Sequence, residues 1–186
     1  MRLLLPVLLA ACESSAPSPA PAAPTAPPSV PEPLPASAIS GASATSELNL
    51  NDTTYGARDA VDGDRATAWC EGEDGLGDGA TLTVTLKAPT ALSHVRIDGG
   101  YFKDDRALVN NGRPRKATLN VDGGDPIQVL FPLVVERRYR AKKIPVKPVD
   151  VPINAEARTV SLTLVSSDKG RASEDVCISE IAFFGS

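Results

Sequence analysis

Residues 59–70 concentrate oxygen-bearing side chains in a short stretch of chain. Asp62, Gly63 and Asp64 form a turn signal, and Thr67 follows three residues later. Hard cations such as Ca²⁺ take carboxylate and carbonyl oxygens from turns of this kind. The alternative is that Asp62 and Thr67 only cap the turn, through bonds from their side chains to the backbone.

A second segment near the C-terminus offers the same chemistry, because Glu180 follows Cys177 by three residues. If Cys177 is bonded to Cys70, then Asp62, Thr67 and Glu180 must lie within a few residues of one point. The two ends of one domain would then be joined by a disulfide and by a shared metal.

The first residues have the composition of an export signal, with Arg2 supplying a positive charge and residues 3–9 apolar except for Pro6. This apolar run is shorter than the roughly 20 residues that a membrane span needs. Residues 9–12, Leu-Ala-Ala-Cys, resemble the lipobox of bacterial lipoproteins. The resemblance implies cleavage before Cys12, lipidation of its thiol and, with Glu13 next, residence in the outer membrane. The alternative is an ordinary signal peptide.

Three segments follow from this pattern. We expect a lipoprotein signal peptide at residues 1–11, a lipidated cysteine with a Pro/Ala-rich linker at 12–38, and a folded domain at 39–186. The linker composition cannot bury a core, so it forms either a semi-rigid stalk or a disordered tether. The net charge of −4 and the export signal argue against a nucleic-acid partner.

The chain has three cysteines, and lipidation of Cys12 leaves Cys70 and Cys177 as an even pair in an oxidising compartment. We expect them to form a disulfide. It would close a loop of about 107 residues, and the chain-entropy model gives such a cross-link about 4–5 kcal/mol. The alternative is two buried free thiols.

Apolar and polar residues alternate in several short runs of the folded part. In residues 80–86, Leu82, Val84 and Leu86 share one face and threonines share the other. The same period recurs in Val160, Leu162 and Leu164, in Ala117, Leu119 and Val121, in Val95 and Ile97, and in Ile181 and Phe183. Such runs, bounded by turn residues, predict half-buried antiparallel strands, and we expect a sandwich without an amphipathic helix.

Several segments resemble, in the same order, the discoidin-like, coagulation-factor type C module. They are residues 55–72, 73–79, 100–103, 110–116 and 175–184. The closer match is to the NAD glycohydrolase translocation domain, also described as an NADase-type glycan-binding domain. The resemblance implies an all-β, antiparallel jelly-roll β-sandwich of the discoidin or galactose-binding-like kind, with about eight strands. The family name describes an accessory module and does not imply NADase activity.

The resemblance also implies a structural Ca²⁺ where the first long loop meets the last strand. Carried over residue by residue, the ligands are carbonyl, carboxylate or hydroxyl oxygens of Asp59, Asp62, Asp64, Thr67, Ser179 and Glu180. Six oxygens suit calcium. The alternative is that Arg65, beside the loop, neutralises the same carboxylates.

A long polar loop with two aromatic rings is the candidate ligand site. Its residues are Tyr101, Phe102, Lys103, Asn110, Asn111 and Arg113. Sugar sites combine an aromatic face for stacking with amide and charged groups for hydroxyls. The alternative is that Tyr101 packs in the core. Gly112 interrupts the Asn-Asn-Arg-Pro run that is continuous in the family.

The sequence argues against catalysis. His94 is the only histidine, it alternates with apolar residues, and no serine has a nucleophile-elbow setting. A zinc site built on several histidines is excluded by the same count. A carboxylate pair for glycoside hydrolysis stays open, because acidic residues are plentiful.

These features predict a non-catalytic envelope lipoprotein whose module binds a carbohydrate or another envelope ligand. The alternative is a protein–protein adaptor that docks a partner enzyme or toxin near the membrane. A basic cluster at residues 137–143 either meets anionic glycan or headgroups or forms a solvated strand edge. The sequence does not indicate an oligomeric state.

Overall fold

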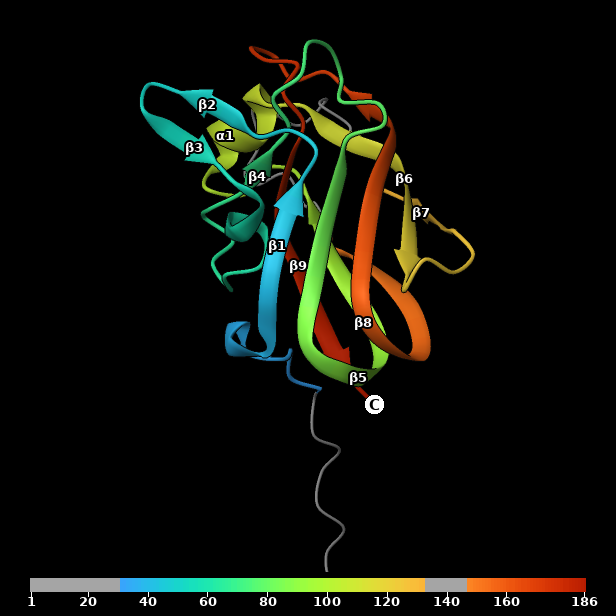
Figure 1. Cartoon of the computed structure of the whole chain (residues 1–186). Coiled ribbons are helices and arrows are strands. Elements are labelled where there is room, and N and C mark those ends of the chain that lie inside the picture. The colour runs from blue at the N-terminus through green and yellow to red at the C-terminus, as the bar shows by residue number, and fades with distance from the viewer. Residues whose placement is uncertain (1–30, 133–146) are drawn as a thin grey trace, which may run out of the picture. The chain divides into compact units, whose positions relative to one another are not determined.

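The alternating runs form strands in residues 31–132 and 147–186, the parts of the chain that the computed structural model describes (Figure 1). The strands are β1 (Ile39–Ala44), β2 (Leu48–Leu50), β3 (Thr53–Tyr55), β4 (Trp69–Cys70), β5 (Thr81–Gly99), β6 (Arg113–Val121), β7 (Ile127–Leu130), β8 (Val149–Asp168) and β9 (Cys177–Gly185). A short helix, η1 (Ala36–Ala38), precedes β1, and two others lie between strands: η2 (Ala57–Ala60) and α1 (Asp105–Asn110). None of these helices has the length and hydropathy of a membrane span. The predicted leader, Cys12 and the basic cluster at 137–143 lie outside the described residues.

The main sheet has the strand order β4-β9-β5-β8-β6-β7, with β1 also paired to β5, and β2 and β3 form a separate hairpin. Strands β5 and β8 run alongside each other for most of their length, with a register shift between Thr85 and Thr90 where both curve. Before the shift β5 also pairs with β1, and after it with β9. The two long strands, β5 and β8, therefore contribute to both layers of the sandwich. This confirms the predicted all-β, antiparallel jelly-roll β-sandwich.

The core lies between the layers and uses the predicted inward-facing residues. Leu82, Val84 and Leu86 are each at most 1% exposed, and the matching residues of β8 and β9 are at most 2% exposed. Burying each such side chain stabilises the fold by roughly 1.5–3 kcal/mol. On the outer face of the same strands, the Thr81 and Thr163 hydroxyls pair at 2.9 Å, which fixes the register.

The described unit begins before the predicted domain boundary. The Leu34 amide donates to the Phe183 carbonyl at 2.7 Å, Pro33 bridges to Phe184, and Leu34 packs against the core. Residues 31–38, which the sequence places in the linker, are thus part of the folded unit. The Pro-rich composition of this segment indicates a linker, and one leucine, Leu34, gives too little signal to show that the segment packs on the domain.

A short helix, α1, was not predicted. The Asp104 carboxylate caps it by accepting the Ala107 amide at 2.7 Å, and Leu108 and Val109 are buried. Six residues are too few to show a helical period, which is why the alternation analysis missed it.

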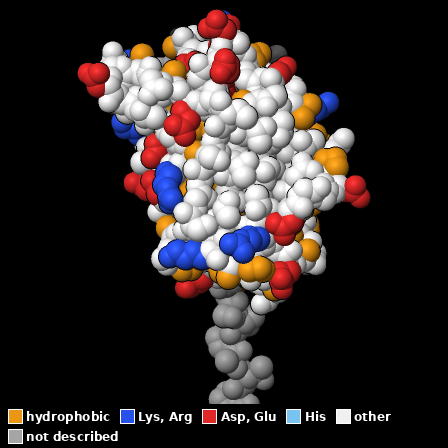
Figure 2. Space-filling model, viewed as in Figure 1, with side chains coloured by type: hydrophobic (Ala, Val, Ile, Leu, Met, Phe, Trp, Pro, Cys, Tyr) orange, Lys and Arg blue, Asp and Glu red, His pale blue; other side chains and the backbone are white. Residues whose placement is uncertain are grey.

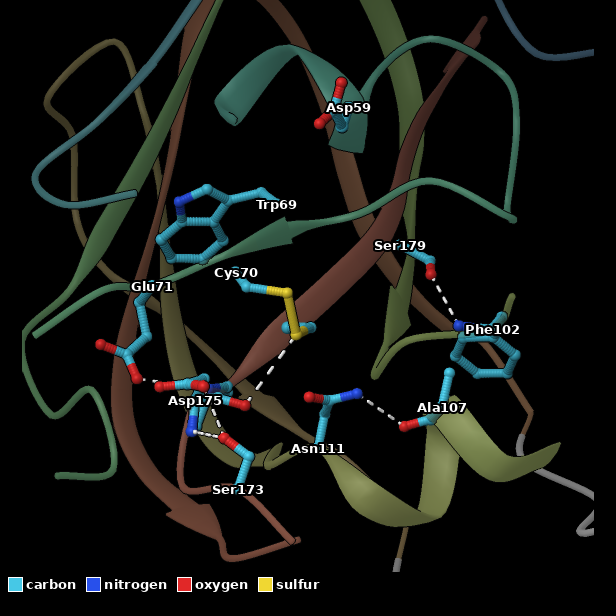
Figure 3. Close-up of a disulfide and its surroundings, with 12 residues drawn as sticks. Asp59, Trp69, Cys70, Glu71, Phe102, Ala107, Asn111, Ser173, Asp175 and Ser179 are labelled. Atoms are coloured by element: carbon cyan, nitrogen blue, oxygen red, sulfur yellow. Dashed lines mark hydrogen bonds between the residues drawn. A yellow bond between two sulfur atoms is a disulfide. The ribbon is translucent and has the colours of Figure 1, made fainter. Parts of the chain in front are cut away.

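Strand β9 carries a bulge beside the predicted metal ligands. Asp98 of β5 lies opposite Glu180, but the next residue, Gly99, lies opposite Ile178, so Ser179 has no partner in the ladder. A bulge re-aims the side chain of its extra residue. Here it sends the Ser179 hydroxyl to the amide of Phe102, 2.8 Å away (Figure 3).

Candidate functional site: an oxygen-rich turn and a braced loop

The turn that follows η2 gathers oxygen atoms around the Thr67 hydroxyl. Its Oγ1 lies 3.1 Å from the Asp59 carbonyl, 3.1 and 2.9 Å from the two Asp62 carboxylate oxygens, and 2.7 Å from the Asp64 carbonyl. A hydroxyl has only one proton to donate, so Thr67 donates to one of these oxygens. Asp62 Oδ1 also accepts the Asp64 amide at 2.8 Å, and the Asp64 carbonyl accepts the Thr67 amide at 3.1 Å. Asp62 and Thr67 therefore cap the turn, as the alternative interpretation of the sequence predicts, and the turn also gathers several oxygen atoms in one place.

Glu180 joins this turn from β9. It is 9% exposed, and its Oε2 accepts the Gly63 amide at 3.0 Å. Burial raises the pKa of Glu180 to about 7, with Asp62, Asp98 and Asp64 adding to the rise and the Gly63 amide opposing it. The predicted meeting of Asp62, Thr67 and Glu180 is therefore present in the structure.

The donor set is poor in side-chain ligands. Within residues 31–132 and 147–186, no group of three or more His, Cys, Asp or Glu side chains surrounds one point. The set depends instead on two carboxylates, Asp62 and Glu180, together with carbonyls and the Thr67 hydroxyl. Oxygen ligands of this mixed kind fit Ca²⁺ rather than a transition metal.

Arg65 does not neutralise the carboxylates of its own turn. Its Nη2 lies 2.8 Å from Asp98 Oδ1 on β5, and its guanidinium sits over the Phe102 ring, 4.6 Å from the centroid. Asp98 is 5% exposed, and burial raises its pKa while Arg65 opposes the rise. The arginine therefore compensates a buried carboxylate outside the turn.

A disulfide joins β4 to β9 at this end of the sandwich. Cys70 and Cys177 are opposite each other in the ladder and bonded, as the cysteine count predicts (Figure 3). Tyr101 and Tyr55 pack against the pair, and their rings meet edge to face with centroids 5.9 Å apart. Trp69, the neighbour of Cys70, is fully buried in the core and donates to the Ser46 carbonyl at 2.9 Å.

Glu71 is a buried carboxylate that the sequence analysis missed. Its Oε1 accepts the Val176 amide at 3.2 Å and its Oε2 accepts the Glu73 amide at 3.0 Å. It thus clamps the loop after β4 to the segment before β9. Burial raises the pKa of Glu71, and the two amides oppose the rise. The only signal for it in the sequence is its place beside Cys70.

The six predicted ligand residues divide into a braced group and an accessible one. Arg113 is 6% exposed and its Nη1 donates to the Leu108 carbonyl at 2.6 Å, while the Asn111 amide donates to the Ala107 carbonyl at 2.9 Å. Both side chains hold α1. The accessible group comprises the exposed Lys103 and the half-buried Tyr101, Phe102 and Asn110.

Gly112 explains how this loop is attached. It bridges to Val176, and a Cβ at this position would lie 2.7 Å from the Glu174 carbonyl oxygen. The interruption that the sequence shows in the Asn-Asn-Arg-Pro run is thus the point where the loop contacts the segment before β9.

His94 is partly exposed on the outer face of β5, stacked on Phe184 with ring centroids 4.3 Å apart. The Ser93 hydroxyl lies 3.0 Å from its Nδ1, and Asp150 lies 3.9 Å from its Nε2. However, Ser93 Oγ is also 3.2 Å from the Phe184 carbonyl and 3.1 Å from that of Gly185. The Ser93 hydroxyl has one proton for these three acceptors, and its two carbonyl contacts place it against β9.

A family model described as the NAD glycohydrolase translocation F5/8 type C domain matches residues 36–184. The chain belongs to this family. A comparison of this chain with curated protein sequences found no match.

Solved structures share its fold. The family 32 CBM of Clostridium perfringens NanJ, in complex with galactose, is 21% identical with a TM-score of 0.54, covering 83% of this chain and 99% of that one. The CBM32-4 domain of a C. perfringens GH89 protein, in complex with GlcNAc-α-1,4-galactose, is 14% identical with a TM-score of 0.55, covering 84% and 97%. The CBM32-1 and CBM32-2 domains of C. perfringens ZmpB are 11% identical with a TM-score of 0.58, covering 83% of this chain. The present chain spans 36% of that two-domain structure.

Proposed function

We propose that this F5/8 type C domain is a non-catalytic carbohydrate-binding module whose ligand site is the accessible part of the 101–113 loop. The observation that carries the proposal is a loop with Lys103 exposed and two aromatic rings half-buried, held by α1, the disulfide and the Gly112 contact. A preorganised loop binds with a smaller loss of conformational entropy. The similarity to sugar-bound CBM32 domains supports the same assignment.

The charge of the loop end favours a neutral sugar. Figure 2 shows acidic side chains at the top of the molecule. In Figure 1, α1 and the loops that precede β5 and β9 lie at this end. Exposed acids outnumber exposed bases in the loops at residues 72–80, 103–110 and 169–175: Glu73, Asp74, Asp78, Asp104, Asp105 and Glu174 against Lys103, Arg106, Lys169 and Arg171. An acidic surface repels uronates and sulfated glycans.

A glycan array probed with the purified chain tests this function. We expect neutral glycans to bind, Lys103→Ala to weaken the binding, and Lys116→Ala to leave it unchanged, because Lys116 is equally exposed but lies on β6. Arg113→Ala is expected to lower the melting temperature first, since it removes the brace of α1. Capture of one envelope protein, undiminished by free sugar, would instead establish the adaptor function.

We also propose that the oxygen-rich turn holds a structural Ca²⁺. Asp62 and Glu180 would supply carboxylates, Asp59, Asp64 and Ser179 carbonyls, and Thr67 its hydroxyl or carbonyl. The ion would supply the positive charge that the converging oxygens and the buried Glu180 otherwise lack.

Calcium should raise the melting temperature of the chain, and Asp62→Ala should abolish the rise. The control Asp125→Ala removes an exposed acid from the β6–β7 turn and should keep it. Equal melting of all three proteins with calcium and with chelator would refute the site.

The envelope location is the third part of the proposal. We propose that a lipid on Cys12 anchors the protein to the outer membrane. Expression with a radiolabelled fatty acid should label the wild-type protein and leave Cys12→Ser unlabelled. Secretion of an unlabelled wild-type protein would point to the ordinary signal peptide.

A further inference from the structure

Arg65 connects the oxygen-rich turn to the start of the ligand loop. It stands in the turn between Asp64 and Thr67, but its guanidinium lies 2.8 Å from Asp98 and 4.6 Å from the centre of the Phe102 ring. Phe102 is the second residue of the proposed ligand loop. The side chain of Arg65 is half exposed, so these contacts compete with water and depend on where the turn holds the Arg65 backbone.

Phe102 is also tied to the turn by a second route. Its amide donates to the Ser179 hydroxyl at 2.8 Å, and the neighbour of Ser179, Glu180, accepts the Gly63 amide at 3.0 Å. The contacts therefore form a closed ring: Gly63, Glu180, Ser179, Phe102, Arg65 and back along the chain. A change in the turn can therefore reach Phe102 both at its amide and at its ring.

A cation in the turn would fix the backbone on both sides of Arg65, because Asp62 and Asp64 precede it and Thr67 follows it. We propose that Arg65 couples this turn to the ligand loop: a cation held by the turn keeps Arg65 on Asp98 and Phe102, and residues 101–111 become more ordered. The inference rests on the calcium site proposed above. If the cation raises the affinity of the loop for its ligand by some factor, linkage requires that the ligand raise the affinity of the turn for the cation by the same factor.

Arg96 provides a matched control. It lies two residues from Asp98 on β5 and makes the same two kinds of contact as Arg65, an ion pair of 2.7 Å with Asp150 and a position 5.0 Å from the centre of the Phe184 ring. Neither partner belongs to the ligand loop. Arg96→Gln therefore removes an equivalent pair of contacts and leaves the contacts of Arg65 with Asp98 and Phe102 in place, although it also removes a positive charge that acts on Asp98.

Amide hydrogen exchange of the full chain, in calcium and in chelator, tests the coupling. In the wild type and in Arg96→Gln, we expect calcium to slow exchange about fivefold or more both in residues 59–67 and in residues 101–111. In Arg65→Gln, the slowing should persist in full in 59–67 and become clearly smaller in 101–111, where only the route through Glu180 and Ser179 remains. Phe102→Leu should give the same result. This second variant keeps the ion pair between Arg65 and Asp98, so it serves as the test if Arg65→Gln folds poorly.

Three results would overturn the inference. The first is slowing of 101–111 that survives undiminished in both Arg65→Gln and Phe102→Leu. The second is slowing confined to 59–67 in the wild type, and the third is no slowing in either segment. Glycan binding is measured separately. Coupled exchange in a chain that binds no glycan would support the coupling while refuting the carbohydrate function.

Discussion

Glu71 illustrates how one carboxylate can join two segments. Its two oxygens accept amides from Val176 and Glu73, and it is fully buried. In Glu71→Gln the side-chain NH₂ would face one of these donors and leave it without an acceptor. We expect the free energy of unfolding to fall by about 1–3 kcal/mol in a denaturant titration. Glu73→Gln, exposed and next in the same loop, should stay at the wild-type value. Equal stability of both variants would show that Glu71 is not a clamp.

The same residue predicts a pH dependence. Burial raises the folded-state pKa of Glu71 above its ordinary value of 4.5, so the native state holds the proton more tightly than the unfolded chain. Its contribution to stability is complete below pH 4.5 and is lost as the pH rises through the folded pKa. Unfolding at a series of pH values should show the penalty of Glu71→Gln shrinking as the pH rises. A penalty that grows would contradict the direction of the shift.

At the scale of single residues, the sequence predicted which side chains come together better than it predicted what each side chain does. Asp62, Thr67 and Glu180 meet because the cysteine argument ties their segments together. The brace made by Arg113 was not predicted, because an arginine in a polar loop has the same local pattern whether it is exposed or buried. Only the fold decides which carbonyl lies within its reach.

Among the elements, the contact between α1 and the segment before β9 depends on a single glycine. In Gly112→Ala the new Cβ would lie 2.7 Å from the Glu174 carbonyl oxygen, a backbone atom with little freedom to move. Overpacking of this kind typically costs about 1–3 kcal/mol, so the melting temperature should fall. Gly41→Ala in β1 is the control, because no atom lies within 4 Å of its Cβ position. Similar melting of the two variants would mean that the contact yields easily.

The elements themselves were largely predictable. Alternation identifies the strands because each has one face in the core, as for Leu82, Val84 and Leu86. It does not show that β5 continues past residues 87–90, where Lys-Ala-Pro-Thr looks like a turn. The continuation depends on the pairing of the strand with β8, which is a tertiary property.

For the whole domain, the disulfide should set the strength of the proposed cation site. It joins Cys70 and Cys177, which are 107 residues apart in the sequence, and it holds β4 on β9 close to Glu180. Reduction, or Cys70→Ser with Cys177→Ser, should lower the melting temperature and also diminish the rise caused by calcium. A ligand at 100 times its Kd stabilises by about 2.7 kcal/mol, and a weakened site gives less at the same concentration. An undiminished calcium effect after reduction would show that the turn closes without the cross-link.

Strand β9 also has a mechanical consequence. At one end it carries Cys177 and Ser179, which hold the ligand loop, and at the other its Phe183 carbonyl holds Leu34, where the chain enters the domain (Figure 1). Part of any tension between a bound surface and the N-terminal segment would therefore run along β9, alongside the covalent path through β1 and β5. Its ladders with β4 and β5 would be loaded in shear, so many hydrogen bonds must break together. A strand built in this way suits a module that stays attached while its ligand is pulled.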